Sequence, residues 1–150
     1  MYLPIEQMPD HSRVWVYQAN RPFTASETQA IQDYLASALT QWAAHGAGLN
    51  ASFEIRFQQV IVIAVDETVN AASGCSIDAS TRWFKALGEA LQVDFFSRDV
   101  AVVRNEQVRL LPLGQLKAAV EAGNLAHNDQ IITPLLQTVQ QYRESWLSTA

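Results

Sequence analysis

The first half of the chain contains short apolar runs separated by turn-forming residues, a pattern that predicts β-strands. Residues 14–17 are Val-Trp-Val-Tyr, a β-branched and aromatic run typical of a strand that is buried on at least one face. Residues 53–57 alternate apolar and polar side chains, which predicts a strand with one solvated face. Residues 60–65 are apolar without interruption, so we expect a central strand that is covered on both faces.

Two stretches have the period of an amphipathic helix. Thr24 and Glu27 match a capping box, in which each side chain bonds the backbone amide of the other residue at a helix start. Gly46 is placed to end this first helix. A second helix is predicted to begin near Asp78. The buried stripe of the first helix is Ile31, Tyr34, Leu35, Ala38, Leu39 and Trp42, and that of the second is Trp83, Phe84, Leu87 and Leu91.

The C-terminal third predicts two further strands and two further helices. Residues 100–103 and 108–111 are apolar strand candidates with a bend at residues 105–106. A short helix is expected over residues 113–122, ending at Gly123. Thr133 is expected to cap a last helix with Pro134 at its first position. The inner face of this last helix would be formed by Leu135, Val139, Tyr142 and Trp146.

The order of these elements predicts an α+β fold. A mostly antiparallel sheet backed by helices is the simplest arrangement, with a ferredoxin-like βαββαβ core and a C-terminal helical extension. We expect a single domain over residues 1–150, in which residues 1–13 form an extended leader. The chain is long enough to bury roughly 68–70% of the surface that it exposes when unfolded.

Composition and charge narrow the class of protein. The chain is 49% hydrophobic and 17% charged, a balance that excludes intrinsic disorder. Its formal net charge is -5, and no basic stretch stands out, so we expect no nucleic-acid partner.

Targeting signals are not evident. The first residues lack the basic start and continuous apolar run of a secretory signal, and no window is apolar enough to span a membrane. We therefore expect a cytoplasmic location without membrane insertion. The single cysteine, Cys75, is consistent with a reducing compartment.

Common catalytic and cofactor motifs are missing from the sequence. It contains no Walker A loop, no G-x-G-x-x-G, no H-E-x-x-H, no C-x-x-C and no G-x-S-x-G. The sequence therefore lacks the motifs that usually identify an ATPase, a dinucleotide enzyme, a zinc protease or an α/β-hydrolase. We expect no cofactor. The three histidines are scattered, so we also expect no metal site.

The strongest candidate chemistry lies between residues 66 and 80. Asp66 ends the most apolar strand, and Cys75 lies just before a predicted helix, where the helix dipole would favour a thiolate. Cys75 could therefore be a catalytic nucleophile with His45 or Asp66 as its partner. The alternative is that Cys75 is a small buried hydrophobe and that His45 complements the dipole at the end of the first helix.

A second candidate site uses the amides at the start of the second helix. Ser76, Asp78 and Ser80 surround this helix start, and unpaired amides there attract anions or small ligands. The alternative is structural, since Asp78 can be an ordinary N-cap and both serines can bond the local backbone.

Four segments carry a resemblance to a known family. At residues 14–18, 42–46, 65–67 and 74–80 the chain resembles a family of short, uncharacterised bacterial proteins that often carry the label "ABC transporter ATPase". That label implies nucleotide hydrolysis, which requires a phosphate-binding Walker A loop and its lysine. Residues 74–76 have neither the second glycine nor the lysine, so we transfer no catalytic role.

Three functions remain open at this point. The chain could be a non-catalytic binding module with a protein partner or with a second copy of itself. It could be a small thiol-dependent or hydrolytic enzyme centred on Cys75, or a domain that binds an anion or small ligand near residues 76–80. We favour the binding module, because the sequence shows no complete catalytic set.

Overall fold

A computed structural model describes residues 4–45, 50–66, 74–112, 115, 118, 121–123, 129–132 and 136–149 of the chain. Within these ranges, the side chains of residues 42–45, 74–79, 145, 148 and 149 lie outside the description.

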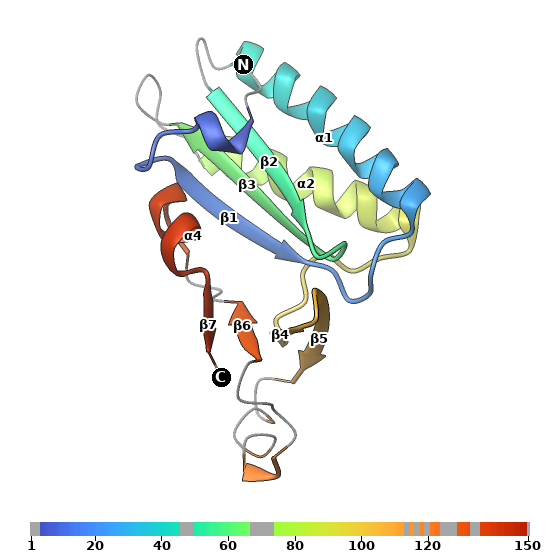
Figure 1. Cartoon of the computed structure of the whole chain (residues 1–150). Helices are drawn as coiled ribbons and strands as arrows, with labels where there is room; N and C mark the ends of the chain where they lie inside the picture. Colours follow the sequence, from blue (N-terminus) through green and yellow to red (C-terminus); the bar gives the residue numbers. More distant parts are fainter. Residues whose placement is uncertain are drawn as a thin grey trace.

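The first layer of the fold is a three-stranded antiparallel sheet with the order β1-β3-β2 (Figure 1). Its strands are β1 (Arg13–Gln18), β2 (Asn50–Arg56) and β3 (Val60–Asp66). Every residue from Val60 to Val65 is 0% exposed. The expectation of a central strand covered on both faces is therefore confirmed, because uninterrupted apolar sequence is tolerated only where both faces are buried.

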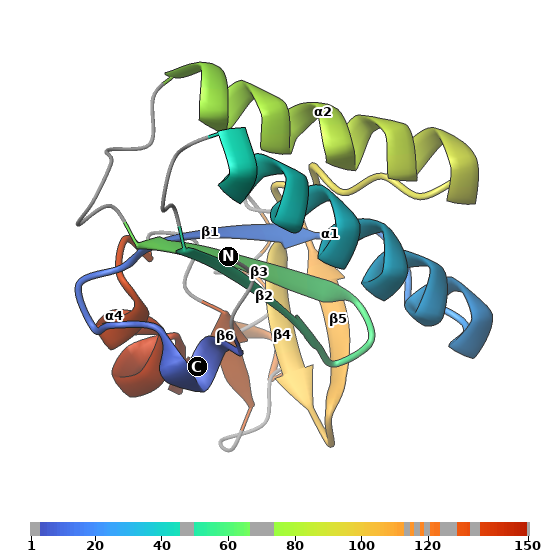
Figure 2. The same cartoon turned by 90° about the horizontal axis from the view of Figure 1, so that it is seen from above.

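Two long helices, α1 (Ala25–His45) and α2 (Gly74–Leu91), cover one face of this sheet (Figure 2). The capping box is confirmed: Glu27 N donates to Thr24 Oγ1 at 3.2 Å, and Thr24 N donates to Glu27 Oε1 at 2.9 Å. The second helix begins at Gly74 instead of near Asp78. Between the helices and the sheet lies an apolar cluster built around Ile31, Leu35, Ile61, Ile63, Phe84 and Leu87.

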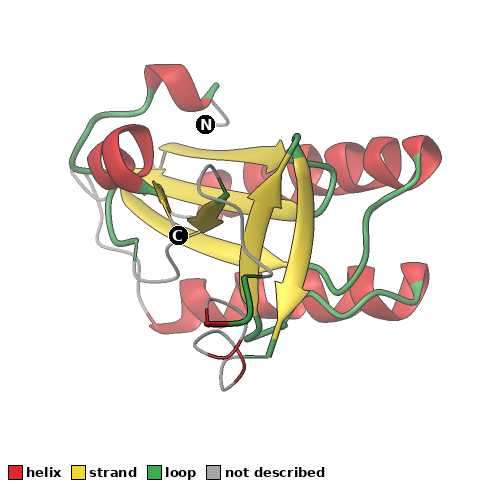
Figure 3. Ribbon diagram, turned by 60° about the horizontal axis from the view of Figure 1, so that its bottom comes forward, coloured by secondary structure: helices red, strands yellow, loops and turns green. Residues whose placement is uncertain are grey.

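A second antiparallel sheet, with the order β5-β4-β6-β7, lies against the other face of the first (Figures 2 and 3). Its strands are β4 (Val100–Arg104), β5 (Gln107–Leu111), β6 (Gln130–Ile132) and β7 (Leu147–Thr149). A 3-10 turn, η1 (Ile5–Gln7), and the short helix α4 (Val139–Ser145) complete this side. The core between the layers includes Ile5, Met8, Val62, Ala101, Val103 and Trp146.

The α+β class is confirmed, whereas the ferredoxin-like order is not. A ferredoxin-like core needs its fourth strand beside β1, but β4 pairs with β5 and β6 in the second sheet. The segment before β4 joins the end of β1 through a parallel bridge between Gln18 and Phe96 and through hydrogen bonds between Gln18 and residues 97 and 99. The chain leaves the first layer at this point, and β4 buries Ala101, Val102 and Val103 in the second.

The C-terminal region differs from its sequence pattern in where its helix begins. Thr138 caps α4 and forms a capping box with Gln141, whereas Thr133 and Pro134 lie outside the described residues. Val139, Tyr142 and Trp146 are buried as expected. Most of the helix expected over residues 113–122 also lies outside the described residues, and β6 and β7 were not expected. None of the helices that the structure describes is long and apolar enough to cross a bilayer.

Candidate binding surface

The structure places one of the three candidate catalytic residues in a polar contact. Asp66 ends β3, and its Oδ1 lies 3.4 Å from Nε2 of His11. The Asp66 side chain is 12% exposed and that of His11 is 64% exposed. His11 also borders a hollow of about 520 Å³, together with Arg13, Trp15 and Thr138. Asp66 thus contacts His11, a histidine that the sequence pattern did not single out.

Of the other candidate site residues, one is buried, and the side chains of the other four lie outside the described part of the structure. Ser80 is 2% exposed, and its hydroxyl lies 3.0 Å from the hydroxyl of Tyr17. Its oxygen therefore joins α2 to β1 inside the fold. The backbones of His45 and of Cys75, Ser76 and Asp78 belong to α1 and α2, but their side chains lie outside the described residues.

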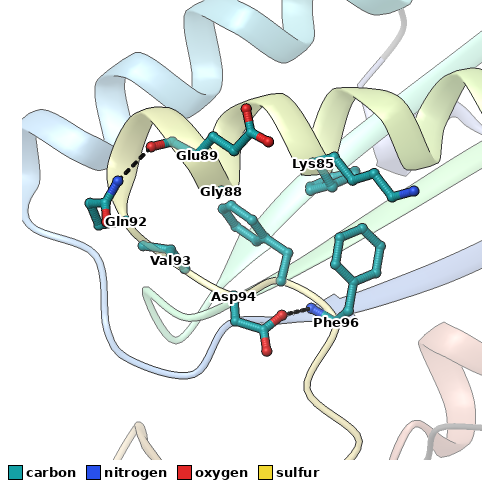
Figure 4. A pocket seen from close by; sticks show the side chains of 9 residues that line it. Lys85, Gly88, Glu89, Gln92, Val93, Asp94 and Phe96 are labelled. Carbon is teal, nitrogen blue, oxygen red and sulfur yellow. Dashed lines mark hydrogen bonds between the residues drawn. The ribbon is translucent and has the colours of Figure 1, made fainter.

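A different feature stands out beside the C-terminal half of α2. Here an open hollow of about 470 Å³ lies between the helix and the chain that follows it (Figure 4). Phe84, Val93 and Phe95 are buried beneath it, while Phe96 is 41% exposed at its side. Its rim is formed by Lys85, Glu89, Gln92 and Asp94.

Gly88 allows the chain to turn back under the helix at this place. A Cβ atom at Gly88 would lie 2.6 Å from the carbonyl oxygen of Val93, closer than side-chain carbons approach an oxygen. The backbone amide of Val93 donates to the carbonyl oxygen of Gly88 at 3.0 Å. Gln92 makes the turn with a φ of 57°, and its side chain donates to the carbonyl oxygen of Glu89 at 2.9 Å. The hollow is therefore the consequence of a close helix-to-loop contact.

The segment after this turn, residues 94–96, is held in part by hydrogen bonds to Asn20, which lies just after β1. Asn20 N donates to the carbonyl oxygen of Asp94 at 2.9 Å, and Asp94 N donates to Asn20 Oδ1 at 3.0 Å. The Asp94 carboxylate accepts the amide of Phe96 at 2.8 Å (Figure 4). These bonds fix the backbone on both sides of Phe95, which buries one aromatic ring and leaves the next at the surface.

Phe96 lies at the outer end of a row of aromatic rings. Its ring meets Tyr17 edge-on, with centroids 5.9 Å apart, and Tyr17 stacks on Phe84 at 3.8 Å. Phe84 in turn meets Phe95 at 5.3 Å. Because Tyr17 and Phe84 belong to β1 and α2, the exposed ring rests on the rigid part of the fold.

An arginine ties the end of α2 to the start of α1. Arg21 donates to both carboxylate oxygens of Glu27 and to the carbonyl oxygen of Leu91, at 2.8, 2.7 and 2.7 Å respectively. Hydrogen bonds from Arg21 and from the Thr24 backbone lower the pKa of Glu27 to about 2 from its ordinary 4.5. The same pairing raises the pKa of Arg21. Glu27 is thus ionised near neutral pH, and the link holds the last turn of α2 beside the hollow.

The rim of the hollow is charged but not of one sign. Lys85 extends from α2 beside the Phe96 ring (Figure 4). Glu89 and Asp94 supply two carboxylates. Among the described residues, Lys85, Glu89 and Asp94 form no salt bridge within 4.0 Å. An apolar platform surrounded by such charges is the usual make-up of a protein contact surface.

The sequence contains a signal for this surface in two neighbouring phenylalanines. Phe95 and Phe96 are adjacent in an extended segment between a helix and a strand. Neighbouring side chains of an extended chain point in opposite directions, so burial of one ring exposes the other. Which of the two is exposed depends on the fold.

Neither a metal site nor similarity to known proteins helps to assign a function to this chain. No group of three or more histidine, cysteine, aspartate or glutamate side chains is placed to hold a metal ion within the ranges given above. Comparison with protein-family models, with curated proteins and with solved structures finds no match for this chain.

Proposed function

We propose that this chain is a non-catalytic binding module of the bacterial cytoplasm that holds a protein partner at the hollow beside Phe96. The observation that carries the proposal is the exposed ring of Phe96 over a floor of Phe84, Val93 and Phe95. Aromatic side chains held rigidly at the surface are the residues that contribute most to protein association. The resemblance to short bacterial proteins and the single cysteine support the cellular location.

A protein fits this hollow better than the other classes of ligand. The hollow is open along its length, whereas small-molecule sites bury most of their ligand. Its rim has two carboxylates, Glu89 and Asp94, against one ammonium group, that of Lys85, and the chain as a whole carries a charge of -5. Nucleic acid would be repelled by that balance. We expect the partner to insert an apolar side chain next to a basic one.

The experiment replaces Phe96 by a photo-crosslinking phenylalanine analogue in the cells from which the chain comes. Tyr34 provides the matched control: the helical period predicted it to be buried, but it is 39% exposed, close to the 41% of Phe96. We expect one discrete cross-linked product from position 96 and none of that mass from position 34. The same complex should be lost from purifications of Phe96→Ser and Glu89→Lys, and it should be retained by Tyr34→Ser.

The binding proposal fails on two outcomes. Equal cross-linking at positions 34 and 96 would mean that the rings are merely accessible. A complex that survives Phe96→Ser in a folded variant would place the partner elsewhere on the surface. Circular dichroism melting of each variant separates loss of binding from loss of fold.

One observation favours a second candidate function, a small hydrolytic enzyme. Asp66 and His11 form a carboxylate–imidazole pair, and His11 borders a hollow of about 520 Å³. Such a pair can act as a general base if a nucleophile lies within reach. Cys75 is the single cysteine, so a thiol reagent reports on it alone. Fast labelling of Cys75 that slows at least tenfold in Asp66→Asn would support the enzyme, and slow labelling unaffected by Asp66→Asn would reject it.

A further inference from the structure

The two borders of the first sheet differ in how they are covered. On the β1 border, Val14 N donates to the carbonyl oxygen of Gln137, and Ser97 N donates to that of Gln18. On the β2 border, no backbone hydrogen bond from another segment reaches Ile55 among the described residues. The 3-10 turn η1 also contacts β2, so the part of this border along which a further strand could pair is the part around Ile55.

The register shows which backbone groups of β2 face outward. Because Val14 N bonds away from β3, the pairs Trp15–Ile63 and Tyr17–Ile61 are those hydrogen-bonded across β1 and β3. The intervening residues of β3, which include Val60 and Val62, then bond toward β2. Their partners Glu54 and Arg56 therefore direct their backbone N–H and C=O groups toward β3. The N–H and C=O of Ile55 consequently point away from the sheet.

Around Ile55 the β2 border contains neither a proline nor a bulge. Edge strands are commonly blunted by proline, by a bulge or by being very short. β2 runs Asn-Ala-Ser-Phe-Glu-Ile-Arg over seven residues, and its register with β3 is continuous. Its two charged residues, Glu54 and Arg56, have opposite charge and lie on the same face of the sheet. Their side chains are 31% and 34% exposed.

We propose that two copies of this chain pair antiparallel along β2 about a twofold axis at Ile55. A twofold axis there places Ile55 opposite Ile55 of the second copy, and both residues present outward-facing backbone groups. It also places Glu54 opposite Arg56 of the second copy, twice. Opposite charges directly across a strand pair stabilise it, and like charges oppose it. An axis at Glu54 would instead set Glu54 against its own copy, so charge selects the register.

This surface is separate from the hollow beside Phe96. Phe96 adjoins β1, and β2 forms the opposite border of the same sheet (Figure 1). Pairing along β2 joins the first sheets of the two copies into one and leaves both Phe96 hollows at its outer ends. The inference does not rest on the proposed partner of Phe96. Because β2 ends at Arg56, only residues 54–56 of each copy lie opposite one another in this register, so we expect a weak dimer that forms as the concentration rises.

The test exchanges the two charges one at a time and then mixes the variants. Sedimentation of the wild type should show an average mass that rises from 16.7 kDa toward twice that value with concentration. Glu54→Arg alone and Arg56→Glu alone should each stay monomeric over the same range, because each variant faces like charges across the axis. An equimolar mixture of the two variants should dimerise again, because one variant then contributes only arginine at these two positions and the other contributes only glutamate.

Three results would overturn the proposal: a wild type that stays monomeric, single variants that dimerise unchanged, or a mixture that stays monomeric. Glu54 and Arg56 both contact Tyr142, so each variant is first checked for its melting transition. A cross-linking experiment tests the pairing if a charge variant does not fold.

This experiment uses Ile55→Cys in a Cys75→Ser background. Two copies of residue 55 would lie about 5.5 Å apart and should form a disulfide-linked dimer. Asn50→Cys is the control, because its copies would lie roughly 30 Å apart in this register, and equal cross-linking of both variants would reject the pairing.

Discussion

Gly88 is the residue on which the shape of the hollow beside α2 depends most directly. The helix interior gives no reason for glycine, because alanine is the better helix former by about 1 kcal/mol. The reason lies outside the helix, in the carbonyl oxygen of Val93, which a Cβ atom would approach to 2.6 Å. The acceptor is backbone and cannot rotate away, so the loop itself would have to move.

Gly88→Ala should therefore destabilise the protein by about 1–3 kcal/mol, as overpacking does, although helix propensity alone predicts a gain. The measurement is the free energy of unfolding in denaturant. Ala90→Gly on the exposed side of α2 is the control, and it should cost about 1 kcal/mol from propensity. A Gly88→Ala variant that is more stable than the wild type would show that the contact with Val93 is not a constraint.

Candidate site residues were harder to predict than core residues. The burial of Phe84 and Val139 follows from periodicity, because a helix buries one stripe. The contact of Asp66 with His11 joins residues far apart in the sequence, and no local pattern encodes it. Whether Phe95 or Phe96 faces solvent depends on the bonds that Asn20 makes to Asp94, which are equally non-local.

At the scale of elements, capping residues in the sequence predict where helices begin. The capping box at Thr24 is followed by a long helix, α1, and the ion pair from Glu27 to Arg21 joins its first turn to the last residue of α2. Arg21 thus connects two helix ends whose helices also share an apolar cluster.

The lowered pKa of Glu27 gives the stability a defined pH dependence. A carboxylate whose pKa is lower in the folded state stabilises the fold above its ordinary pKa, and this contribution is lost as the pH falls. The pKa of Glu27 is lowered from 4.5 to about 2. The stability difference between wild type and Glu27→Gln should therefore be constant above about pH 5.5 and shrink between about pH 5 and pH 2. Urea unfolding across this range measures it, and a difference independent of pH would show that the Arg21 pair does not act on folding.

Long elements followed from the sequence, and short ones did not. α1 and β3 have enough residues to show a clear period. β6 and β7 each contain three residues, too few for any alternation to be recognised. The sequence offers Thr133 as a helix cap, but α4 begins after Thr138, which has the capping-box spacing with Gln141.

At the scale of the whole molecule, β3 is the common element of two cores. Its odd-numbered residues Ile61 and Ile63 pack under α1 and α2, and its even-numbered residues Val60, Val62 and Ala64 pack against the second sheet. The proposed binding surface and the proposed pairing border lie on opposite sides of this strand. The arrangement requires that both layers unfold together when β3 is released.

Native-state hydrogen exchange of the backbone amides in Val60–Val65 tests this requirement most directly. The structure predicts that these amides belong to the slowest class in the molecule and that their exchange free energy equals the free energy of global unfolding measured with denaturant. Amides of β5, which forms an outer strand of the second sheet, should exchange through smaller openings. Exchange of Val60–Val65 as fast as that of β5, well below the global free energy, would contradict a central strand shared by both layers.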